Sequence, residues 1–369
     1  MTDANLLYTD VETALRESVR ALLSDQCPAE RVADCYDGDS ALATRLWRPL
    51  AADLGLAGLL VPEERGGAGA SAREAAVVLE ELGRACAPVP FLTSAVIATR
   101  VLLGTVENGL LSQLAEGQRT AALAVPLATS PHEYSPTVQE SGDGALTGQI
   151  SGVAGALEAD VLLVPARRGG ELALHALDVD SVTVTPVVSL DMTRQLADLD
   201  LNGATGRRIL NGGTETVLSQ ALELGTALLA SEQLGLAQWC LDATVAYLGE
   251  RIQFGRTVGG FQALKHRLAD LYVRIEAART AARYAAGTEA DRDPDRHVAA
   301  LMASTYCSET AVAAAEECVQ LHGGIGMTWE HPAHLYLKRA QADQLALGSP
   351  QVIRRRLGDL VDLPMPTSS

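Results

Sequence analysis

Positive charge is scarce in this sequence and a long hydrophobic run is absent, and each shortage excludes a class of protein. The 369 residues carry a formal net charge of −17. Nucleic acids and anionic membranes bind proteins through a basic face, so neither is an expected partner. No run of about 18 uninterrupted apolar residues occurs, so the sequence predicts no membrane span.

Cysteine is also sparse, and it does not occur in the patterns of metal sites. The six cysteines show neither a CxxC pair nor a Cys/His spacing suited to zinc. A metal site and a disulfide framework are therefore not predicted, and a reducing cytoplasm is the expected location. The N-terminal stretch, residues 1–19, is acidic and polar, which is unlike a secretory signal. The cysteines are Cys27, Cys35, Cys86, Cys240, Cys307 and Cys318.

Hydrophobic periodicity divides the chain into three parts. In the first part, apolar residues recur at spacings of three and four, as at Leu15, Val19 and Leu22, which is typical of amphipathic helices. The second part has short alternating or apolar runs, which predict a small β-domain whose central strand is residues 159–166. Long helical patterns then return. We expect an α+β fold with an N-terminal helical domain (1–118), a middle β-domain (119–214) and a C-terminal four-helix bundle (215–369).

Individual helices can be placed within the two helical parts. Small residues in the first long C-terminal helix, among them Gly225, Ala230 and Gly235, would let neighbouring helices pack closely against it. Helices are predicted at residues 71–84, 94–103, 216–249, 261–286 and 297–321.

The stretch from residue 319 to 349 carries the clearest functional signal. An apolar helical pattern ends at residues 323–326 (GGIG), and a loop with Trp329, Glu330 and His331 precedes a second helical run. Three glycines in four positions let backbone amides approach a ligand such as a phosphate closely. On its own, GGIG is explained more simply as a glycine cap with a tight turn, so the flanking residues must decide.

A second informative stretch, residues 247–270, places two arginines beside an interhelical turn. Arg251 and Arg256 flank the turn, and Phe254 and Phe261 give it aromatic faces. The planar arginine fork can donate two hydrogen bonds to a pyrophosphate at once. Composition alone leaves open the alternative of solvated loop arginines beside phenylalanines that fill the bundle.

Taken together, these stretches resemble the acyl-CoA dehydrogenases. The segments ERIQFG…FQALKHRLADL and QLHGGIGMTWEHP…LYLKRA stand at a separation similar to that of the family's two C-terminal motifs. The N-terminal run LWRPLAADLGLAGLLVPEERGGAGA and the middle segments EADVLLVPA and SLDMTRQLADLDL are similar to the same family, so the resemblance covers essentially the whole chain. It implies a flavoenzyme with an α–β–α subunit that introduces an α,β double bond into an acyl-CoA thioester.

The resemblance also implies FAD bound across a subunit interface. In the family, the R-x-x-F-G and Q-x-x-G-G-x-G turns reach the ADP portion of the neighbouring subunit's cofactor. An arginine fork, amide side chains and exposed backbone amides suit a pyrophosphate. The matching residues in this chain are Arg251, Gln253, Phe254, Gln262, Gln320, Gly323 and Gly324.

The family's catalytic base is missing from both places where members carry it. That base is a carboxylate, which removes the α-proton while hydride leaves the β-carbon for the flavin. One family position, in a Glu-Gly-Thr segment, matches Leu347 of Leu347-Gly348-Ser349, and the other, on the long helix, matches Gly225. Glu232 lies two turns beyond Gly225, about 10 Å along the axis, and is the remaining candidate. A structural ion pair is its simpler interpretation.

The flavin side of the site departs from the family as well. The T-E-P-x-x-G-S-D segment of the family, which lies against flavin and substrate, matches residues 124–134 (AVPLATSPHEY) without its acid or its Gly-Ser turn. The Trp-x-Thr segment that contacts the flavin ring matches residues 153–155 (VAG). The segments that would contact the flavin ring depart from the family, whereas the turns that would contact the ADP portion match it. A simple homotetrameric enzyme would be expected to keep both sets of residues.

These departures favour a non-catalytic subunit of a heteromeric (α₂β₂) acyl-CoA dehydrogenase. The chain is similar to actinobacterial heteromeric members, some of which oxidise CoA thioesters of steroid side chains. It would lend the ADP-binding half of the FAD site to a second family subunit that supplies the base. Two alternatives stay open: a self-sufficient homotetrameric enzyme with Glu232 as a relocated base, and a redox-inactive acyl-CoA-binding or structural protein.

Overall fold

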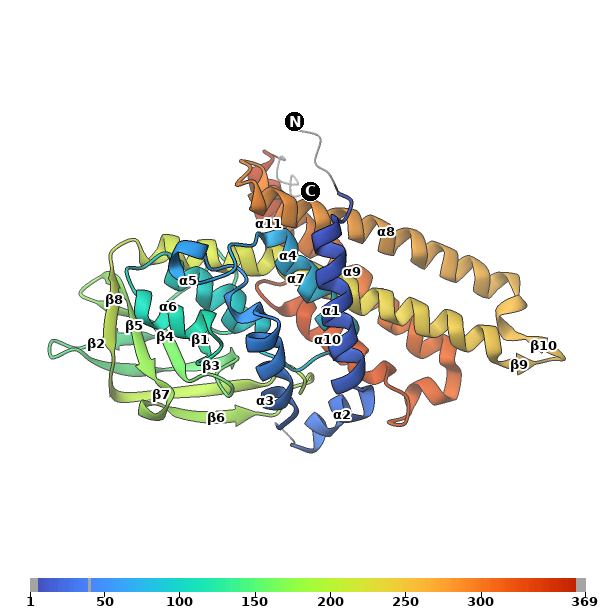
Figure 1. The fold of residues 1–369 in the computed structure, drawn as a ribbon, viewed down its shortest axis with the longest axis horizontal. Helices are drawn as coiled ribbons and strands as arrows, with labels where there is room; N and C mark the ends of the chain where they lie inside the picture. Colours follow the sequence, from blue (N-terminus) through green and yellow to red (C-terminus); the bar gives the residue numbers. More distant parts are fainter. Residues whose placement is uncertain (1–5, 39–40, 363–369) are drawn as a thin grey trace, which may run out of the picture.

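The computed structural model describes residues 6–38 and 41–362. Figure 1 shows a β-sheet at one end of the molecule and a long helical bundle at the other, with the N-terminal helices packed where the two meet. The predicted α+β class and the order of helical, β and helical parts are confirmed. Residues 1–5 of the acidic N-terminal stretch and residues 363–369 of the expected bundle lie outside the described residues.

The helices that begin at Asp10 and Ala72 have side-chain caps that the sequence encodes. The Thr9 hydroxyl accepts from the amide of Glu12, and the Glu12 carboxylate accepts from the amide of Thr9. Ser71 and Glu74 form the same reciprocal cap at the start of α4. The helices are α1 (Asp10–Gln26), α2 (Ala29–Ala33), α3 (Ala41–Arg48), α4 (Ala72–Arg84), α5 (Thr99–Leu103) and α6 (Asn108–Ala115).

The predicted helix over residues 71–84 is confirmed, but the one over 94–103 is only partly right. A wider π-helical segment, Phe91–Ala98, begins directly after Pro90, and α5 follows it. Proline lacks an N–H but is tolerated at the start of a helix, where no intrahelical partner is needed. The helical segment therefore starts three residues earlier than its periodicity indicated.

The middle part is a mixed sheet in the order β6-β7-β3-β2-β4-β5-β8, with β1 also paired to β4. The strand predicted to be central is β4, which pairs with β1, β2 and β5 and is buried over most of its length. The strands are β1 (Ala121–Leu123), β2 (Val138–Glu140), β3 (Ala145–Ala154), β4 (Val161–Arg168), β5 (Glu171–Asp178), β6 (Thr183–Val187), β7 (Leu196–Thr205) and β8 (Arg207–Asn211).

The C-terminal bundle is built on three long helices, and a shorter helix supplies the fourth. The first long helix runs for 37 residues and is joined to the second by a two-stranded hairpin. The elements are α7 (Thr214–Glu250), β9 (Ile252–Gln253), β10 (Arg256–Thr257), α8 (Gln262–Ala290), α9 (Arg296–His322), α10 (Ala333–Leu345) and α11 (Pro350–Leu360). The shorter fourth helix, α10, packs on α9 and α7.

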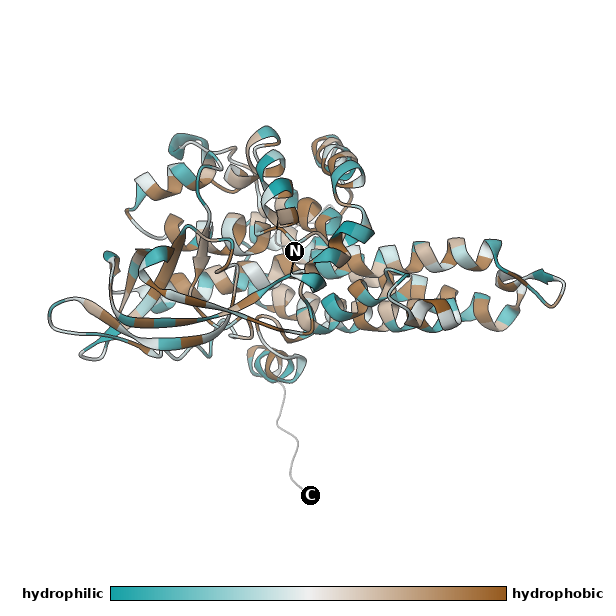
Figure 2. Ribbon diagram, turned by 90° about the horizontal axis from the view of Figure 1, so that it is seen from below, coloured by the Kyte–Doolittle hydropathy of each residue, from teal (hydrophilic) through white to brown (hydrophobic). Residues whose placement is uncertain are grey.

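Apolar residues line the interior faces of the sheet and the bundle, while the hairpin at the bundle tip extends into solvent (Figure 2). Within residues 6–38 and 41–362, none of the helices combines the length and apolar character that a membrane crossing needs.

Helices α4 and α7 touch through their backbones. A methyl group on Gly83 of α4 would stand 2.1 Å from the Glu232 carbonyl oxygen, and one on Gly235 of α7 would stand 1.9 Å from the Glu80 carbonyl oxygen. Only glycine allows such an approach from both sides. The close packing expected from the small residues of α7 is therefore present at Gly235.

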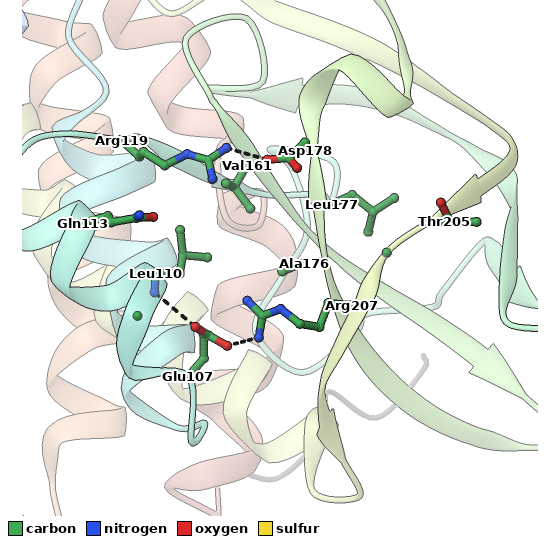
Figure 3. Close-up of a pocket in the computed structure, with 12 residues that line it drawn as sticks. Glu107, Leu110, Gln113, Arg119, Val161, Ala176, Leu177, Asp178, Thr205 and Arg207 are labelled. Atoms are coloured by element: carbon green, nitrogen blue, oxygen red, sulfur yellow. Dashed lines mark hydrogen bonds and ion pairs between the residues drawn. The ribbon is translucent and has the colours of Figure 1, made fainter.

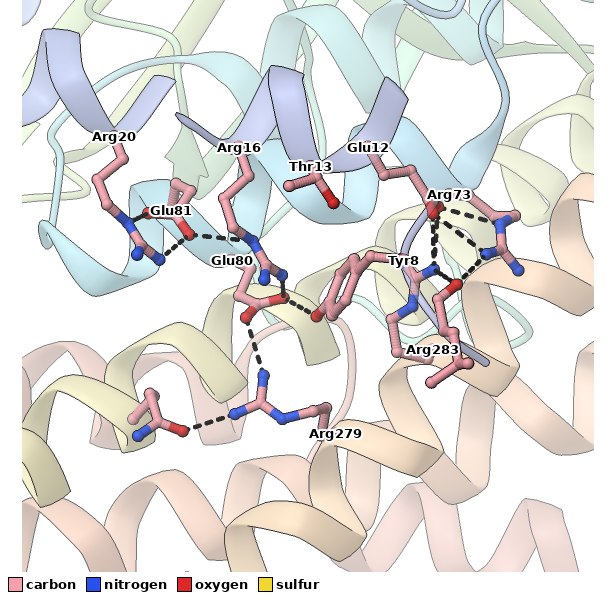
Figure 4. A network of polar contacts seen from close by, with 12 residues as sticks. Tyr8, Glu12, Thr13, Arg16, Arg20, Arg73, Glu80, Glu81, Arg279 and Arg283 are labelled. Carbon is pink, nitrogen blue, oxygen red and sulfur yellow. Dashed lines mark hydrogen bonds and ion pairs between the residues drawn. The ribbon is translucent and has the colours of Figure 1, made fainter. Parts of the chain in front are cut away.

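Buried carboxylates tie α1 to α4 and to α8 (Figure 4). Glu12 is fully buried and accepts from Arg73 Nε at 3.0 Å and from Arg283 Nη2 at 2.9 Å. Glu80 accepts from Arg16, Arg279 and the Tyr8 hydroxyl. Burial acts to raise the pKa of Glu12, but the Thr9 amide and the two arginines outweigh it, so the pKa lies below its ordinary value.

Replacing Glu12 with Gln should lower the free energy of unfolding by about 3 kcal/mol, because two guanidinium groups lose their buried counter-charge. Since the folded-state pKa is depressed, the contribution of Glu12 is present above its ordinary pKa of 4.5 and is lost as the pH falls below it. Urea unfolding of Glu12→Gln followed by circular dichroism measures the loss, with the exposed Glu17→Gln on the same helix as control. Equal stability of the two variants near neutral pH would contradict the assignment.

Candidate cofactor and acyl-CoA site

The two glycine- and arginine-bearing turns meet at the far end of the bundle. Arg251 directly follows α7, and Gly323 directly follows α9. Between these helix ends, the rings of Tyr247 and His322 stack with their centroids 4.5 Å apart. The fold therefore brings sequence segments about seventy residues apart into one surface, beside the β9–β10 hairpin in Figure 1.

Phe254 occupies an unusual place at the tip of the hairpin. Its φ is +52°, that of the following Gly255 is +74°, and its side chain is 91% exposed. A left-handed backbone is costly for an aromatic residue, and a solvated ring gains nothing from burial. Behind it, Phe261 meets Phe254 edge-on at 6.2 Å and carries the Arg256 guanidinium over its face at 3.8 Å. An exposed aromatic held in a strained turn is typical of a binding surface.

The glycines of the second turn have different tasks. Gly323 has φ +64° and ψ −139°, a conformation that a residue with a Cβ rarely adopts. No atom lies within 4 Å of where a Cβ would stand on Gly323 or Gly324, so both present open backbone. Gly326 is instead structural, because a methyl there would stand 2.5 Å from the Val319 carbonyl oxygen.

The side chains at these turns fit an anionic cofactor. In the described part of the chain, Arg251, Gln262 and Gln320 are exposed and engage no other side chain, and the Gln253 amide reaches only the neighbouring Ile252 carbonyl, at 2.9 Å. A guanidinium and three amides beside open glycine backbone are the donor types that a pyrophosphate needs. These are the residues that would hold the ADP portion of FAD.

A buried cluster beneath the glycine turn was not identified from the sequence. Cys318 Sγ lies 3.6 Å from His322 Nδ1, and the His322 ring packs on His331 at 4.1 Å. The hydrogen bond between Cys318 and Cys240 lowers the pKa of Cys318 to about 5, and His322 lowers it further. Cysteine and histidine one turn apart on a helix are a weak signal, since that spacing occurs in many cores.

Leu347 and Gly225 lie in contact with one another. A Cβ on Gly225 would stand 3.2 Å from Leu347 Cδ1, and Leu347 is 2% exposed. The Leu347 amide donates to the Leu127 carbonyl at 2.8 Å, and its φ of +56° is unusual for a branched residue. Beside the pair lies a small cavity of only about 20 Å³, lined by Thr93, Ile97, Leu123, Val125, Pro126, Leu127, Ala154, Leu222 and Leu347.

Glu232 is held between two arginines. Its carboxylate accepts from Arg194 Nη2 at 2.6 and 2.8 Å and from Arg339 Nε at 2.8 Å. Complete burial acts to raise the pKa of Glu232, but the two guanidinium groups outweigh it and leave the pKa below its ordinary value. A carboxylate engaged in this way is a poor proton acceptor. Burial raises the pKa of the neighbouring Asp343, which also pairs with Arg194, to about 7.

A cleft of about 620 Å³ between α6 and strands β4, β5 and β8 lies away from both turns (Figure 3). Leu110 and Leu177 contribute to its apolar wall. Its charged residues pair with each other: Arg207 bonds Glu107, and Arg119 lies 2.5 Å from Asp178. We assign these pairs to the joint between the helical and β parts. In the described residues, no group of His, Cys, Asp and Glu side chains is arranged to hold a metal ion.

Comparisons with known proteins identify the family. The model for the N-terminal domain of acyl-CoA dehydrogenases matches residues 9–109, and that for the C-terminal domain matches residues 211–361. The acyl-CoA dehydrogenase IpdE2 of Mycolicibacterium smegmatis is 37% identical over 93% of this chain and 96% of that protein. This chain belongs to the acyl-CoA dehydrogenase family. It is thus related to FAD-dependent oxidoreductases, and the family cofactor is the one that the sequence predicted.

Solved structures place this acyl-CoA dehydrogenase near heteromeric relatives. A variant of the Tcur3481–Tcur3483 steroid acyl-CoA dehydrogenase is 30% identical, with a TM-score of 0.84 over 96% of this chain and 98% of that one. The ChsE4–ChsE5 complex of Mycobacterium tuberculosis contains a chain that is 28% identical, with a TM-score of 0.86 over 98% of this chain and 100% of that one.

Phe254→Gly should separate binding from stability. It removes a left-handed aromatic whose backbone costs about 1 kcal/mol, so the melting temperature of the isolated chain should stay the same or rise. Retention of FAD by the assembled enzyme should fall, because the exposed ring is lost from the proposed cofactor surface. Thermal unfolding of the chain alone and flavin absorbance of the assembled protein are the two measurements. A fall in melting temperature together with unchanged flavin content would show that the ring is merely structural.

Proposed function

We propose that this chain is the non-catalytic subunit of a heteromeric acyl-CoA dehydrogenase, in an α₂β₂ assembly. It would present Arg251, Gln253, Phe254 and the Gly323 turn to the ADP portion of an FAD. A second family subunit would hold the flavin ring and supply the carboxylate base. The two heteromeric neighbours, Tcur3481–Tcur3483 and ChsE4–ChsE5, support an assembly of this kind.

The observation that carries this proposal is the contact between Leu347 and Gly225. These are the two positions at which family members place the base, and here they pack together with no carboxylate among the residues that line the adjoining cavity. A cavity of about 20 Å³ holds no more than a single water, so an acyl chain does not fit without rearrangement. Leu347 keeps a left-handed backbone without a group that could accept a proton.

Residues 153–155, the segment that matches the family's flavin contact, are also tightly packed. A Cβ on Gly155, within the segment that matches the family's flavin contact, would stand 2.5 Å from Thr93 Oγ1, so the segment packs directly on the helical part. The Leu127 carbonyl accepts from the Leu347 amide, and the Leu127 amide donates to the Gly152 carbonyl. These two hydrogen bonds hold the loop that follows β1 beside the cavity. We infer that only the ADP half of the site functions in this subunit.

When bound, FAD would accept the hydride from the substrate's β-carbon. This chain would orient the cofactor: Arg251 would neutralise pyrophosphate charge, the amides of Gln253 and Gln320 would donate hydrogen bonds, and Phe254 would shield the site from water. By analogy with the steroid acyl-CoA dehydrogenase neighbour, we propose a steroid side-chain CoA ester as substrate of the complex. The six free, buried cysteines support a reducing, cytoplasmic location.

Purification of the chain alone and together with its partner tests this function. The partner is a family member that retains the Glu and the T-E-P-x-x-G-S-D segment. Alone, the chain should carry little FAD and should not oxidise acyl-CoA, whereas the co-expressed complex should do both. Full flavin occupancy with normal turnover in the isolated chain would sink the proposal.

Within the complex, Arg251→Gln should reduce the FAD that survives gel filtration by about tenfold, the effect of losing one charge-assisted contact of about 1.5 kcal/mol. The exposed Arg45→Gln on α3 is the matched control and should retain full flavin. Both chains should unfold at the wild-type temperature, because neither arginine has an ion pair within the described residues.

The self-sufficient alternative makes Glu232 the base, and Glu232→Gln distinguishes the two accounts. We expect loss of about 3 kcal/mol of stability, because Arg194 and Arg339 would remain buried without their counter-charge. Chemical unfolding and turnover are both measured. A Glu232→Gln complex that keeps its stability and its flavin yet loses all turnover would favour the relocated base.

A further inference from the structure

A second cleft, of about 500 Å³, contains a chain of hydrogen-bonding side chains that the proposed dehydrogenation does not use. It lies between the loop that follows β1, strands β4 and β5, and the start of α7 and α9. Ser219, His132, Glu223 and His297 line it, together with Arg167 and Arg296.

The distances form an unbroken relay. Ser219 Oγ lies 3.2 Å from His132 Nδ1, and His132 Nε2 lies 3.0 Å from Glu223 Oε1. The other carboxylate oxygen of Glu223 lies 3.1 Å from His297 Nδ1. Ser219 and Glu223 are one turn apart on α7, so a single helix fixes both ends of the relay around the imidazole.

The carboxylate decides which nitrogen of His132 carries the proton. A carboxylate only accepts hydrogen bonds, so the nitrogen facing Glu223 must be the N–H donor. His132 Nδ1 is then bare and can accept only from the Ser219 hydroxyl. His297 likewise can donate to the second oxygen of Glu223, so the largely buried carboxylate has an imidazole beside each of its oxygens.

The surroundings keep His132 in its basic, neutral form. Burial lowers the pKa of His132, and the positive charge of Arg356 and the neighbouring His297 add to this effect against the attraction of Glu223. The side chain of His132 nevertheless remains 28% exposed and Ser219 is half-buried, so a ligand in the cleft can reach both.

We propose that Ser219, His132 and Glu223 form a second active site, which transfers the acyl group of an ester or thioester to water. The Ser219 oxygen bonds the carbonyl carbon while its proton passes to His132 Nδ1. The carbon–sulfur or carbon–oxygen bond breaks, and the leaving thiolate or alkoxide takes that proton. Water, deprotonated by His132, then bonds the carbonyl carbon of the acyl-serine. The bond to the Ser219 oxygen breaks, that oxygen takes the proton back from His132, and the carboxylic acid leaves. Arg167 and Arg296 line the same cleft and are the positive charges available in it to a developing oxyanion.

This site is separate from the cofactor turns at Arg251 and Gly323. It uses none of the residues at the bundle tip, and it needs no flavin and no partner subunit. A dehydrogenase subunit with this activity would release CoA from acyl-CoA that the complex does not oxidise. The proposed function can therefore fail while this inference stands, and the reverse also holds.

A fluorophosphonate probe tests for the nucleophile on the full-length chain alone. We expect one covalent adduct, located by mass spectrometry on the peptide that contains Ser219, and no adduct in Ser219→Ala or after heat unfolding. Thr216→Ala, one turn earlier on α7 in the same cleft, should label like the wild type. Absence of an adduct at Ser219 in the folded wild-type chain would overturn the proposal without reliance on any variant.

Thiol release from butyryl-CoA then tests turnover. Release by the wild-type chain should exceed that by Ser219→Ala and by His132→Gln about a hundredfold, the usual contribution of a positioned base. Equal release by wild type and Ser219→Ala, with both folded by circular dichroism, would show that the relay is a structural latch between the loop and α7.

Discussion

The backbone contact between α4 and α7 is the constraint on which the rest of the structure depends. Gly83 of α4 faces the carbonyl of Glu232 on α7, and Gly235 of α7 faces the carbonyl of Glu80 on α4. Each helix therefore contributes one glycine and one buried acid to the crossing. Glu80 forms ion pairs with arginines of α1 and α8. Glu232 forms ion pairs with Arg194, which precedes β7, and with Arg339 of α10. Because buried acids need partners, one crossing determines where four other segments attach.

This crossing also fixes the two ends of the candidate site. From it, α7 runs one way to Gly225, which packs beside Leu347. In the other direction it runs to Arg251 and the hairpin, where the side chains are exposed and Phe254 has a strained backbone. One helix therefore joins the buried apolar surroundings of Gly225 to an exposed polar end at Arg251. That asymmetry, and not the presence of either feature alone, supports a subunit that shares its cofactor.

Sequence patterns predicted the long helices, the central strand β4 and the order of the three parts, because these depend on local periodicity over many residues. They were less reliable at Phe91–Ala98, where a proline start and a π-helical turn shifted the boundary. The Arg194–Glu232–Arg339 cluster and the Ser219–His132–Glu223 relay could not be predicted in this way. Each includes members that are far from the others in the chain, Arg194 and Arg339 in the first and His132 in the second, and only the fold brings them within hydrogen-bond distance. The family motifs marked the two turns, but not the contact that joins them through Tyr247 and His322.

The most direct test of the central claim is an anaerobic titration of the assembled complex with its acyl-CoA substrate, followed by flavin absorbance. If this chain lends only the ADP-binding half of each site, substrate should bleach one flavin for every two chains. Leu347→Glu should not add a second, because it would bury a carboxylate among apolar side chains beside a small cavity. Bleaching of one flavin for every chain would show that this subunit has a complete site of its own and would contradict the account.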